Sequence, residues 1–433
     1  MHLSLSNKEF YLRHNKELEK YLIGENSLHI INLNSKIKIT EDFSDKLYID
    51  LKKDYLNELK IIKKKYDLII LTDVVEVSDD LYSLFNYLNH ALNTNGKLIL
   101  SSINTKWGLV VKILEKFKLK DSNIQFSYIH QNKIQNIICG VGFEFIKSSS
   151  RQIYPFKIFG IGSLLNKILE AIFYKLNLGI KTYIIFRKIE VNKSISSRTI
   201  IIPAKNEEGN LEELFNRIPN KECSEIIFSI GVSKDSTLQI ANKIKNNNSD
   251  IKIKVIEQSN NGKANAVWEA LKYVNSETIA ILDADISVEP ESLDGFFEII
   301  ENNYADFVNG TRLIYEMEKD AMRYLNKKGN IFFQFLISLI IKKKLTDSLC
   351  GTKVFKKNFI KKVMWWQEKY NLKDPFGDFD LLFTAALTGE KIIEYPIHYK
   401  SRKYGSTQIS RFRDGYKLIT YLLKSFIVFN TTD

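Results

Sequence analysis

The sequence predicts an α/β fold in two domains. With 433 residues, the chain is longer than one ordinary domain, and its 44% hydrophobic content is enough for two cores. In both halves, short apolar runs alternate with polar turns and amphipathic helices, which is the order of a sheet wound in βα units. We therefore expect a first domain over residues 1–190 and a second over residues 196–433.

In the second half, three expected strands each end in a polar turn that opens a helix. The strands cover residues 198–203, 225–230 and 251–256, and their turns carry Asn206-Glu207-Glu208, Ser233-Lys-Asp235 and Gly262-Lys263. Acidic residues at such places also cap helices, which is our preferred role for Glu208. Because parallel strands deliver their carboxyl ends to one edge of a sheet, these turns should converge there.

A fourth apolar strand, residues 278–282, leads into Asp283-Ala284-Asp285, a DxD motif. Paired carboxylates at the ligand-binding edge of an α/β sheet suit a divalent cation that carries a diphosphate. A motif this short is common by chance, and taken alone it reads more readily as a solvated acidic turn. Whether this motif binds a metal therefore depends on the other motifs in the second half of the chain.

Seven sequence blocks in order favour a metal site, and through them residues 196–425 resemble glycosyltransferase family 2, whose fold is GT-A. The blocks are Pro203-Ala-Lys-Asn-Glu-Glu, Gly231-Val-Ser-Lys-Asp-Ser-Thr, Gly262-Lys-Ala-Asn-Ala, Leu282-Asp-Ala-Asp, Asn309-Gly-Thr-Arg, Asp347-Ser-Leu-Cys-Gly-Thr-Lys and Asp374-Pro-Phe-Gly-Asp-Phe-Asp. The segment from Glu394 through Arg402 and Gly405 resembles the Arg-x-x-Gly-x-Ser loop of the polyprenol-phosphate sugar transferases, although Thr407 stands in place of its serine.

This resemblance implies a role for each candidate residue. Asp283 and Asp285 would hold Mg²⁺ or Mn²⁺, and Arg312 and Arg402 would face the acceptor phosphate and the diphosphate. The residues expected to bind the nucleotide sugar are Pro203, Ala204, Asn206, Glu207, Ser233, Asp235, Lys263, Asp283 and Ala284.

The catalytic carboxylate is left open between Asp378 and Asp380. A hydroxyl acceptor needs one of them as a general base, whereas a phosphate acceptor is already ionised and needs none. In either case the resemblance implies an inverting transfer of a sugar from a UDP- or GDP-sugar to a lipid phosphate or a membrane-proximal glycan. Such a reaction would serve the synthesis of a cell-surface polysaccharide or a glycolipid.

The first half also reads as a wound sheet, and residues 5–188 resemble the class I S-adenosylmethionine-dependent methyltransferases. The cofactor loop of that family is rich in glycine, but residues 28–36 contain none, so side chains would fill the cofactor's place. Between Leu28 and Asp67 the chain is too short for the usual two further βα units. Asp73 and Glu76 are present, while Val77 stands where family members often carry histidine. We expect a degenerate domain that does not bind S-adenosylmethionine and that scaffolds or docks a partner. The alternative is an active methyltransferase or a bifunctional enzyme.

The charge of the chain bears on its partners. The formal net charge is +12, but the lysines are scattered and no arginine-rich stripe is visible, so we expect no nucleic-acid partner. A basic surface also suits anionic lipid. Two apolar segments, residues 331–341 and 416–429, are too short to span a bilayer, and the sequence leaves interfacial and core helices equally open for them. Residues 158–178 are interrupted by glycines and charges and make a poor spanning helix.

The expected location is the cytoplasm, peripheral on the cytoplasmic face of the membrane. Three widely spaced cysteines form no disulfide framework, and no signal peptide is visible at the N-terminus.

Overall fold

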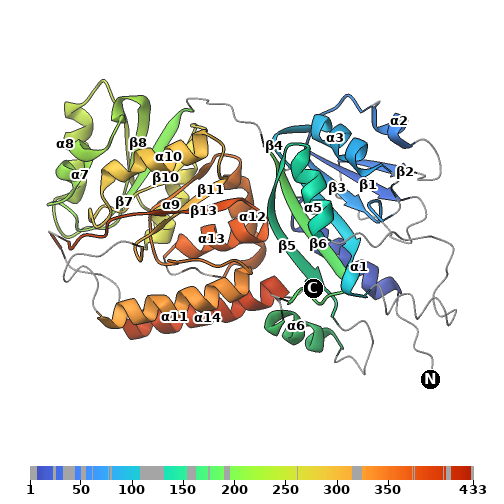
Figure 1. Cartoon of the computed structure of the whole chain (residues 1–433). Coiled ribbons are helices and arrows are strands. Elements are labelled where there is room, and N and C mark those ends of the chain that lie inside the picture. Colours follow the sequence, from blue (N-terminus) through green and yellow to red (C-terminus); the bar gives the residue numbers. More distant parts are fainter. Residues whose placement is uncertain are drawn as a thin grey trace. The chain divides into compact units, whose positions relative to one another are not determined.

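The chain divides into two compact units in this computed structural model (Figure 1). The first unit is Met1–Glu190 with Asn430–Asp433, and the second is Val191–Phe429. The structure describes residues 7–22, 26–32, 44–49, 55–60, 62–76, 78, 80–107, 131–153, 162–173, 176–189, 196–260, 262–314, 324–372, 374, 376–402, 404–405 and 411–430. Val77, Thr407 and residues 33–36, which the sequence argument used, lie outside these ranges.

The first unit is built on a six-stranded sheet in the order β2-β1-β3-β4-β6-β5. Its described elements are α1 (Asn7–Glu19), β1 (Ser27–Asn32), β2 (Asp45–Ile49), α2 (Tyr55–Lys60), β3 (Tyr66–Thr72), α3 (Leu81–Ala91), β4 (Leu92–Ile103), η1 (Thr105–Trp107), α5 (Gln131–Gly140), β5 (Phe143–Arg151), α6 (Gly162–Ile172) and β6 (Lys181–Lys188). Strands β2, β1, β3 and β4 are parallel, and β6 runs antiparallel to both β4 and β5.

Helices cover both faces of this sheet. One core joins alternate strand residues to α3 and α5, and a smaller core joins the opposite strand residues to α1. Helix α3 begins after Asp80, whose side chain caps the helix by accepting the backbone N–H of Ser83 at 2.9 Å. Between β1 and β3 the described chain forms one βα unit, β2 with α2, where the sequence left no room for two.

The second unit is built on a seven-stranded sheet in the order β13-β11-β12-β10-β7-β8-β9. Its described elements are β7 (Arg198–Ala204), α7 (Leu211–Arg217), η3 (Lys221–Cys223), β8 (Ser224–Ile230), α8 (Thr237–Asn247), β9 (Lys252–Glu257), α9 (Lys263–Leu271), β10 (Thr278–Ile281), η4 (Pro290–Ser292), α10 (Leu293–Glu301), β11 (Phe307–Thr311), α11 (Tyr324–Ile341), β12 (Lys353–Lys356), α12 (Phe359–Tyr370), α13 (Asp378–Leu387), β13 (Ile392–Pro396) and α14 (Arg411–Asn430).

This sheet is mixed rather than wholly parallel. Strands β10, β7, β8 and β9 are parallel, whereas β12 runs antiparallel between β10 and β11. Pro203 stays inside β7, opposite Ser229 of β8, so this strand ends one residue later than its proline suggested. Two cores flank the sheet: α7, α8 and α10 pack on one face, and α9, α11, α12, α13 and α14 contribute to the core on the other. The parallel strands therefore direct their carboxyl ends to one shared edge.

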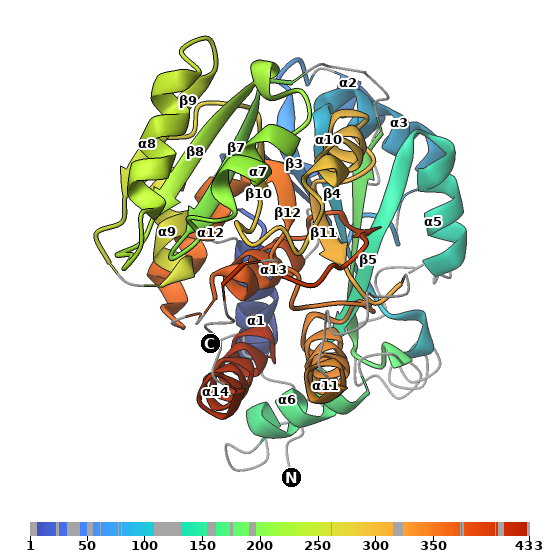
Figure 2. The ribbon, with the colours of Figure 1, turned by 90° about the vertical axis from the view of Figure 1, so that its left-hand side faces the viewer.

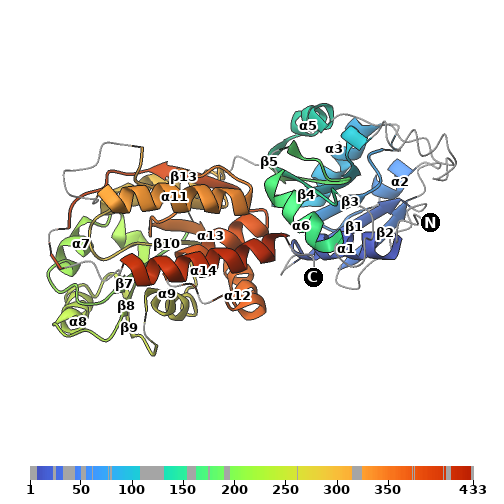
Figure 3. The ribbon, with the colours of Figure 1, turned by 90° about the horizontal axis from the view of Figure 1, so that it is seen from below.

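The two apolar segments of the sequence form helices α11 and α14, which lie side by side (Figures 2 and 3). Each helix buries one face in the core, through residues such as Ile337 and Tyr421. The opposite faces are exposed and apolar: Ile331, Phe332 and Phe335 on α11, and Tyr416, Ile419, Leu423 and Ile427 on α14. No described helix combines the length and the hydropathy that crossing a membrane requires.

Candidate functional site

The first two polar turns of the second unit bind each other at the carboxyl edge of the sheet. Asn206, whose φ of 55° lies in the left-handed region, donates its backbone N–H to the hydroxyl of Ser233 at 3.1 Å. Its side-chain oxygen accepts the backbone N–H of Lys234 at 2.7 Å. The carboxylate of Asp235 accepts N–H groups of Glu208 at 3.2 Å and of Thr237 at 3.1 Å. These hydrogen bonds link the first two turns, which carry residues expected to bind a nucleotide.

Lys263, at the start of α9, joins two carboxylates from distant parts of the chain. Its Nζ lies 2.6 Å from Oδ1 of Asp283 and 3.3 Å from Oδ2 of Asp378, which begins α13. Burial lowers the pKa of Lys263, but the two carboxylates outweigh burial and raise it. Burial likewise raises the pKa of Asp283, and the Lys263 ammonium outweighs it and lowers that pKa. Both groups are therefore charged at neutral pH.

The second carboxylate of the DxD motif has its own cation. Oδ2 of Asp285 lies 2.5 Å from a guanidinium nitrogen of Arg402, while its Oδ1 accepts the backbone N–H of Ser287 at 3.0 Å. The loop that carries Arg402 also reaches the first turn, because the hydroxyl of Tyr404 donates to Glu208 at 3.0 Å. A side chain at Gly209 would overlap the ring of Tyr404, so glycine lets this loop approach.

Two glycines leave room around the DxD motif. A Cβ atom at Gly351 would overlap Oδ2 of Asp283 and Nζ of Lys263, so a side chain there would fill the space beside the carboxylate. Gly377 has a φ of 80° and lies against Ala264, which places Asp378 next to Lys263. Two hard carboxylates beside a cleared backbone fit a divalent cation. Within the described ranges, no group of three or more His, Cys, Asp or Glu side chains gathers as a metal site.

Glu207 is partly buried at the same edge. Its carboxylate accepts the side-chain N–H of Asn210 at 2.6 Å. Burial is the main cause that raises the pKa of Glu207 to about 7, and the nearby carboxylate of Asp285 adds to it. A small change in its surroundings would therefore change its charge near neutral pH.

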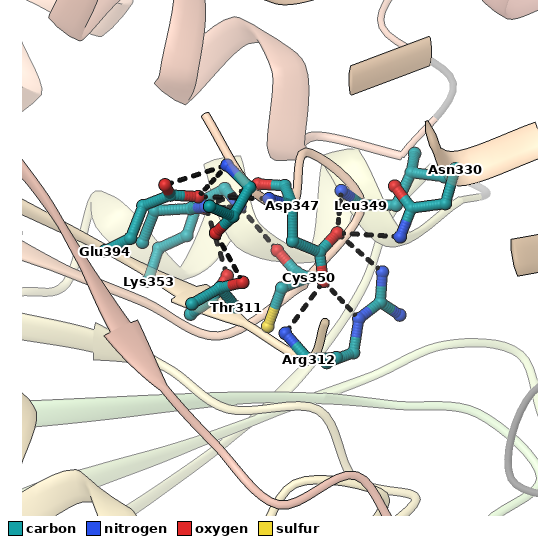
Figure 4. Close-up of polar contacts among 11 residues, drawn as sticks. Thr311, Arg312, Asn330, Asp347, Leu349, Cys350, Lys353 and Glu394 are labelled. Atoms are coloured by element: carbon teal, nitrogen blue, oxygen red, sulfur yellow. Dashed lines mark hydrogen bonds and ion pairs between the residues drawn. The ribbon is translucent and has the colours of Figure 1, made fainter. Parts of the chain in front are cut away.

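Arg312 lies in a buried ion pair (Figure 4). Nε and Nη2 of Arg312 contact the two oxygens of Asp347 at 2.6 and 2.9 Å, a bidentate geometry, and Asn330 of α11 donates to Asp347 at 3.0 Å. Burial raises the pKa of Asp347, but Arg312 outweighs it and lowers that pKa to about 2. The carboxylate of Glu394 accepts the backbone N–H of Asp347 at 3.1 Å. In this structure Asp347 neutralises the guanidinium that the resemblance assigned to an acceptor phosphate.

Asp378 and Asp380 have different surroundings, although both begin α13. Both are buried, with Asp378 7% and Asp380 5% exposed, but their partners differ. Asp380 accepts the indole N–H of Trp366 at 2.7 Å and the hydroxyl of Tyr421 at 2.8 Å. Burial raises the pKa of Asp380. Asp378 instead lies beside Lys263, near the DxD motif. The structure therefore separates a carboxylate at the site from one in the core.

The structure brings most of the expected residues to one edge. The turn residues, Lys263, the DxD motif, Asp378 and Arg402 are linked there by the contacts above, and Pro203 and Ala204 end β7 beside them. Ala284 is buried in the core beneath the motif. Arg312 and Asp380 are held in buried networks instead.

Sequence reasoning missed several supporting residues. Asp347 and Glu394 lie inside recognised segments of the sequence. Nothing in the sequence indicated that Asp347 pairs with Arg312, or that Glu394 accepts the backbone N–H of Asp347. Tyr404 and Gly209 are separated by almost half the chain. Only the fold brings such pairs together.

Comparison with known proteins assigns a family to the second unit. Residues 199–364 match the model of "Glycosyl transferase family 2". The chain is 30% identical over 219 residues to a dolichyl-phosphate hexose transferase of Haloferax volcanii, covering 50% of this chain and 88% of the relative. It is 27% identical to a UDP-N-acetylglucosamine–dolichyl-phosphate N-acetylglucosaminyltransferase of Methanococcus voltae, covering 52% of this chain and 94% of the relative. It is 26% identical to a dolichol-phosphate mannosyltransferase of Pyrococcus furiosus, covering 49% of this chain and 58% of the relative.

Among solved structures, one that resembles the chain is glucosyl-3-phosphoglycerate synthase from Mycobacterium tuberculosis, crystallised with Mn²⁺, uridine diphosphate and phosphoglyceric acid. It is 15% identical, with a TM-score of 0.40, over 54% of this chain and 80% of that protein. The matched family model and the haloarchaeal relative lead to one conclusion: through its second unit, this chain belongs to glycosyl transferase family 2 and is a glycosyltransferase.

Proposed function

We propose that the second unit has the GT-A fold and is a metal-dependent, inverting glycosyltransferase. It moves a sugar from a UDP- or GDP-sugar to a lipid-phosphate or membrane-proximal glycan acceptor, in the synthesis of a cell-surface polysaccharide or glycolipid. The observation that carries the proposal is the cluster of Asp283, Asp285, Lys263 and Arg402 at the carboxyl edge of the sheet. Relatives that act on dolichyl phosphate support the acceptor class.

The donor site needs groups that bind a nucleotide and neutralise a diphosphate. Asp283 and Asp285 would hold Mg²⁺ or Mn²⁺, which supplies Lewis-acid stabilisation of the leaving diphosphate. Lys263 and Arg402 are the cations nearest the two carboxylates, and on donor binding they would contact phosphate oxygens instead. Glu207 and Asp235 would bind the base and the ribose, and the hydrogen bonds that their carboxylates accept within the two linked turns support these roles.

The reaction needs an acceptor group close to the donor sugar. Asp378 is the better candidate for a general base, because Asp380 already accepts two buried hydrogen bonds. With a phosphate acceptor no base is needed, and Asp378 would then only position Lys263. Arg312 would contribute to acceptor binding if Asp347 shared it with an incoming phosphate.

A lipid-linked acceptor requires a surface that meets a membrane. Helices α11 and α14 lie side by side (Figure 2), and their exposed apolar residues would enter the lipid interface without the helices crossing it. Exposed Lys417 and Lys424 on α14 add positive charge that suits anionic lipid. We therefore place the protein on the cytoplasmic face of a membrane as a peripheral protein.

For the first unit we propose a degenerate methyltransferase-like domain. At the edge where a methyl donor would lie, Lys181 forms an ion pair with Asp73, and Glu76 accepts the backbone N–H of Ile103 at 2.7 Å. These contacts engage the two acidic residues that the resemblance would give to the cofactor. Calorimetric titration with S-adenosylmethionine should detect no binding, and micromolar affinity would favour the alternative, a methyltransferase or bifunctional enzyme.

The transferase proposal is tested by donor binding and turnover. Thermal-shift measurements with UDP- and GDP-sugars, with and without Mn²⁺, should find one nucleotide that stabilises the protein only with the metal. Replacing Asp283 and Asp285 together by asparagine should abolish both that stabilisation and sugar transfer. A matched control is Glu212→Gln, an exposed acid on α7. Full activity in the double variant would overturn the metal assignment.

A further inference from the structure

Among the described side chains of helix α6 in the first unit, the usual arrangement is reversed, because two polar ones are buried and two apolar ones are exposed. Asn166 and Glu170, one turn apart, are 4% and 6% exposed. Ile168 and Ile172, also one turn apart, are 45% and 63% exposed. A helix on a water-soluble surface places its polar residues outward, so this helix is arranged for an apolar environment on its outer side.

Buried charge explains how the reversal is held. Arg151, at the end of β5, contacts Glu170 at 3.1 Å and Glu17 of α1 at 3.2 Å. The other oxygen of Glu170 accepts the backbone N–H of Gln152 at 2.6 Å. Removing one partner from a buried network of this kind is costly, so α6 is not free to rotate its apolar side inward. The exposed face is therefore a fixed feature of the fold.

Exposed apolar side chains continue past the C-terminal end of the helix. Phe173 and Leu176, which follow α6, are 37% and 52% exposed. Figure 1 shows α6 outside the layers of its own sheet. A helix of 11 residues is about 17 Å long, too short to cross a bilayer but long enough to lie in its interface.

The charge of the segment identifies the kind of surface. Residues 155–180 contain three lysines, at 157, 167 and 175, and one acid, Glu170. Arg151 neutralises that acid, so by its sequence the segment has a net positive charge. Exposed apolar and aromatic side chains in a segment of net positive charge match the interface of a bilayer that contains anionic lipid.

We propose that α6 with Phe173 and Leu176 is a membrane-docking surface of the first unit, and that its ligand is an anionic lipid surface. This assigns the first unit a role of its own, as a second membrane contact in the same chain. Two linked contacts bind more tightly than either alone, provided that both reach the membrane together. The proposal does not depend on the donor site or on the chemistry of transfer.

The first test measures lipid binding of the full chain. More protein should sediment with vesicles of phosphatidylglycerol and phosphatidylcholine than with vesicles of phosphatidylcholine alone. Replacing Ile168 and Ile172 by glutamate should weaken binding at least roughly tenfold, because two apolar side chains are lost and two negative charges are added. The matched control is Tyr82→Glu, since Tyr82 is an aromatic residue of the same unit that is 61% exposed on α3. Equal binding of both variants would overturn the proposal.

A second measurement leaves the face intact except for one label. The variant Ile172→Cys, in a chain that also carries Cys139→Ser and Cys223→Ser, is labelled with an environment-sensitive fluorophore. The emission of this label should shift to the blue on anionic vesicles, whereas the emission of the same label on Tyr82→Cys should not. No shift at position 172 refutes the contact. A variant that changes the oligomeric mass in light scattering, with lipid binding unchanged, would show that a second copy covers this face and would refute the lipid assignment. Donor stabilisation by Mn²⁺ and nucleotide should persist throughout, which separates this outcome from failure of the transferase proposal.

Discussion

The Arg312–Asp347 pair gives the sharpest stability prediction. Asp347 is fully buried and accepts hydrogen bonds from Arg312, Asn330 and the backbone of Leu349. Asp347→Asn keeps the size of the side chain but leaves the guanidinium of Arg312 buried without a counter-charge. Removing one partner of a buried pair costs about 3–5 kcal/mol. A unit of this length loses about 2–4 °C per kcal/mol, so the melting temperature should fall by about 6–20 °C.

The pKa of Asp347 gives an independent and lower value for the stabilisation by this pair. Its depression from 3.8 to about 2 corresponds to ~2–3 kcal/mol of stabilisation. Because the folded-state pKa is the lower one, this contribution is present above pH 3.8 and is lost as the pH falls through about 2. The variant should therefore lose the part of acid sensitivity that this carboxylate causes.

Tryptophan fluorescence is a suitable assay. Of the four tryptophans, Trp268, Trp365 and Trp366 lie in the second unit and Trp107 in the first, so the signal reports mainly on the unit that carries the pair. The matched control is Glu212→Gln, which breaks a 3.0 Å pair with Lys243 on the surface and should cost no more than about 1 kcal/mol. A loss below about 1 kcal/mol in Asp347→Asn would refute the reasoning.

Three further predictions concern the site. Lys263→Met should tighten Mn²⁺ binding in the absence of donor, because Asp283 loses its cation; weaker binding, measured by the electron paramagnetic resonance of free Mn²⁺, would contradict this. Donor affinity should rise as the pH increases through about 7, because Glu207 accepts hydrogen bonds through both oxygens, and more strongly, once it has lost its proton. Calorimetry should find this dependence absent in Glu207→Gln. Asp380→Asn should lower the free energy of unfolding by roughly 1–3 kcal/mol, because it disturbs two buried hydrogen bonds. Asp378→Asn should reduce transfer to a hydroxyl acceptor with little change in melting temperature. The reverse pattern would exchange the roles of the two residues.

The fold was predictable wherever local signals were strong. Apolar runs such as residues 198–203 and 278–282 became strands, and Gly262-Lys263 opened α9, because periodicity and turn chemistry act over a few residues. The antiparallel strand β12 was not predictable, since strand direction depends on partners far away in the sequence. The strand β2 between β1 and β3 was missed because it is short and flanked by polar residues.

The sequence by itself determined the chemistry that this protein can offer. The residue types and their order identified the family, the DxD motif and the lysine and arginines that accompany it. Those features are carried by short sequence blocks, which can be recognised without the tertiary structure.

Only the tertiary structure decided which of these groups meet. It paired Lys263 with Asp283 and Asp378, and buried Asp380 beneath Trp366. It also turned the apolar side of α6 outward. The physical reason is that burial and ion pairing are properties of three-dimensional packing, which brings together side chains that no local pattern in the chain connects.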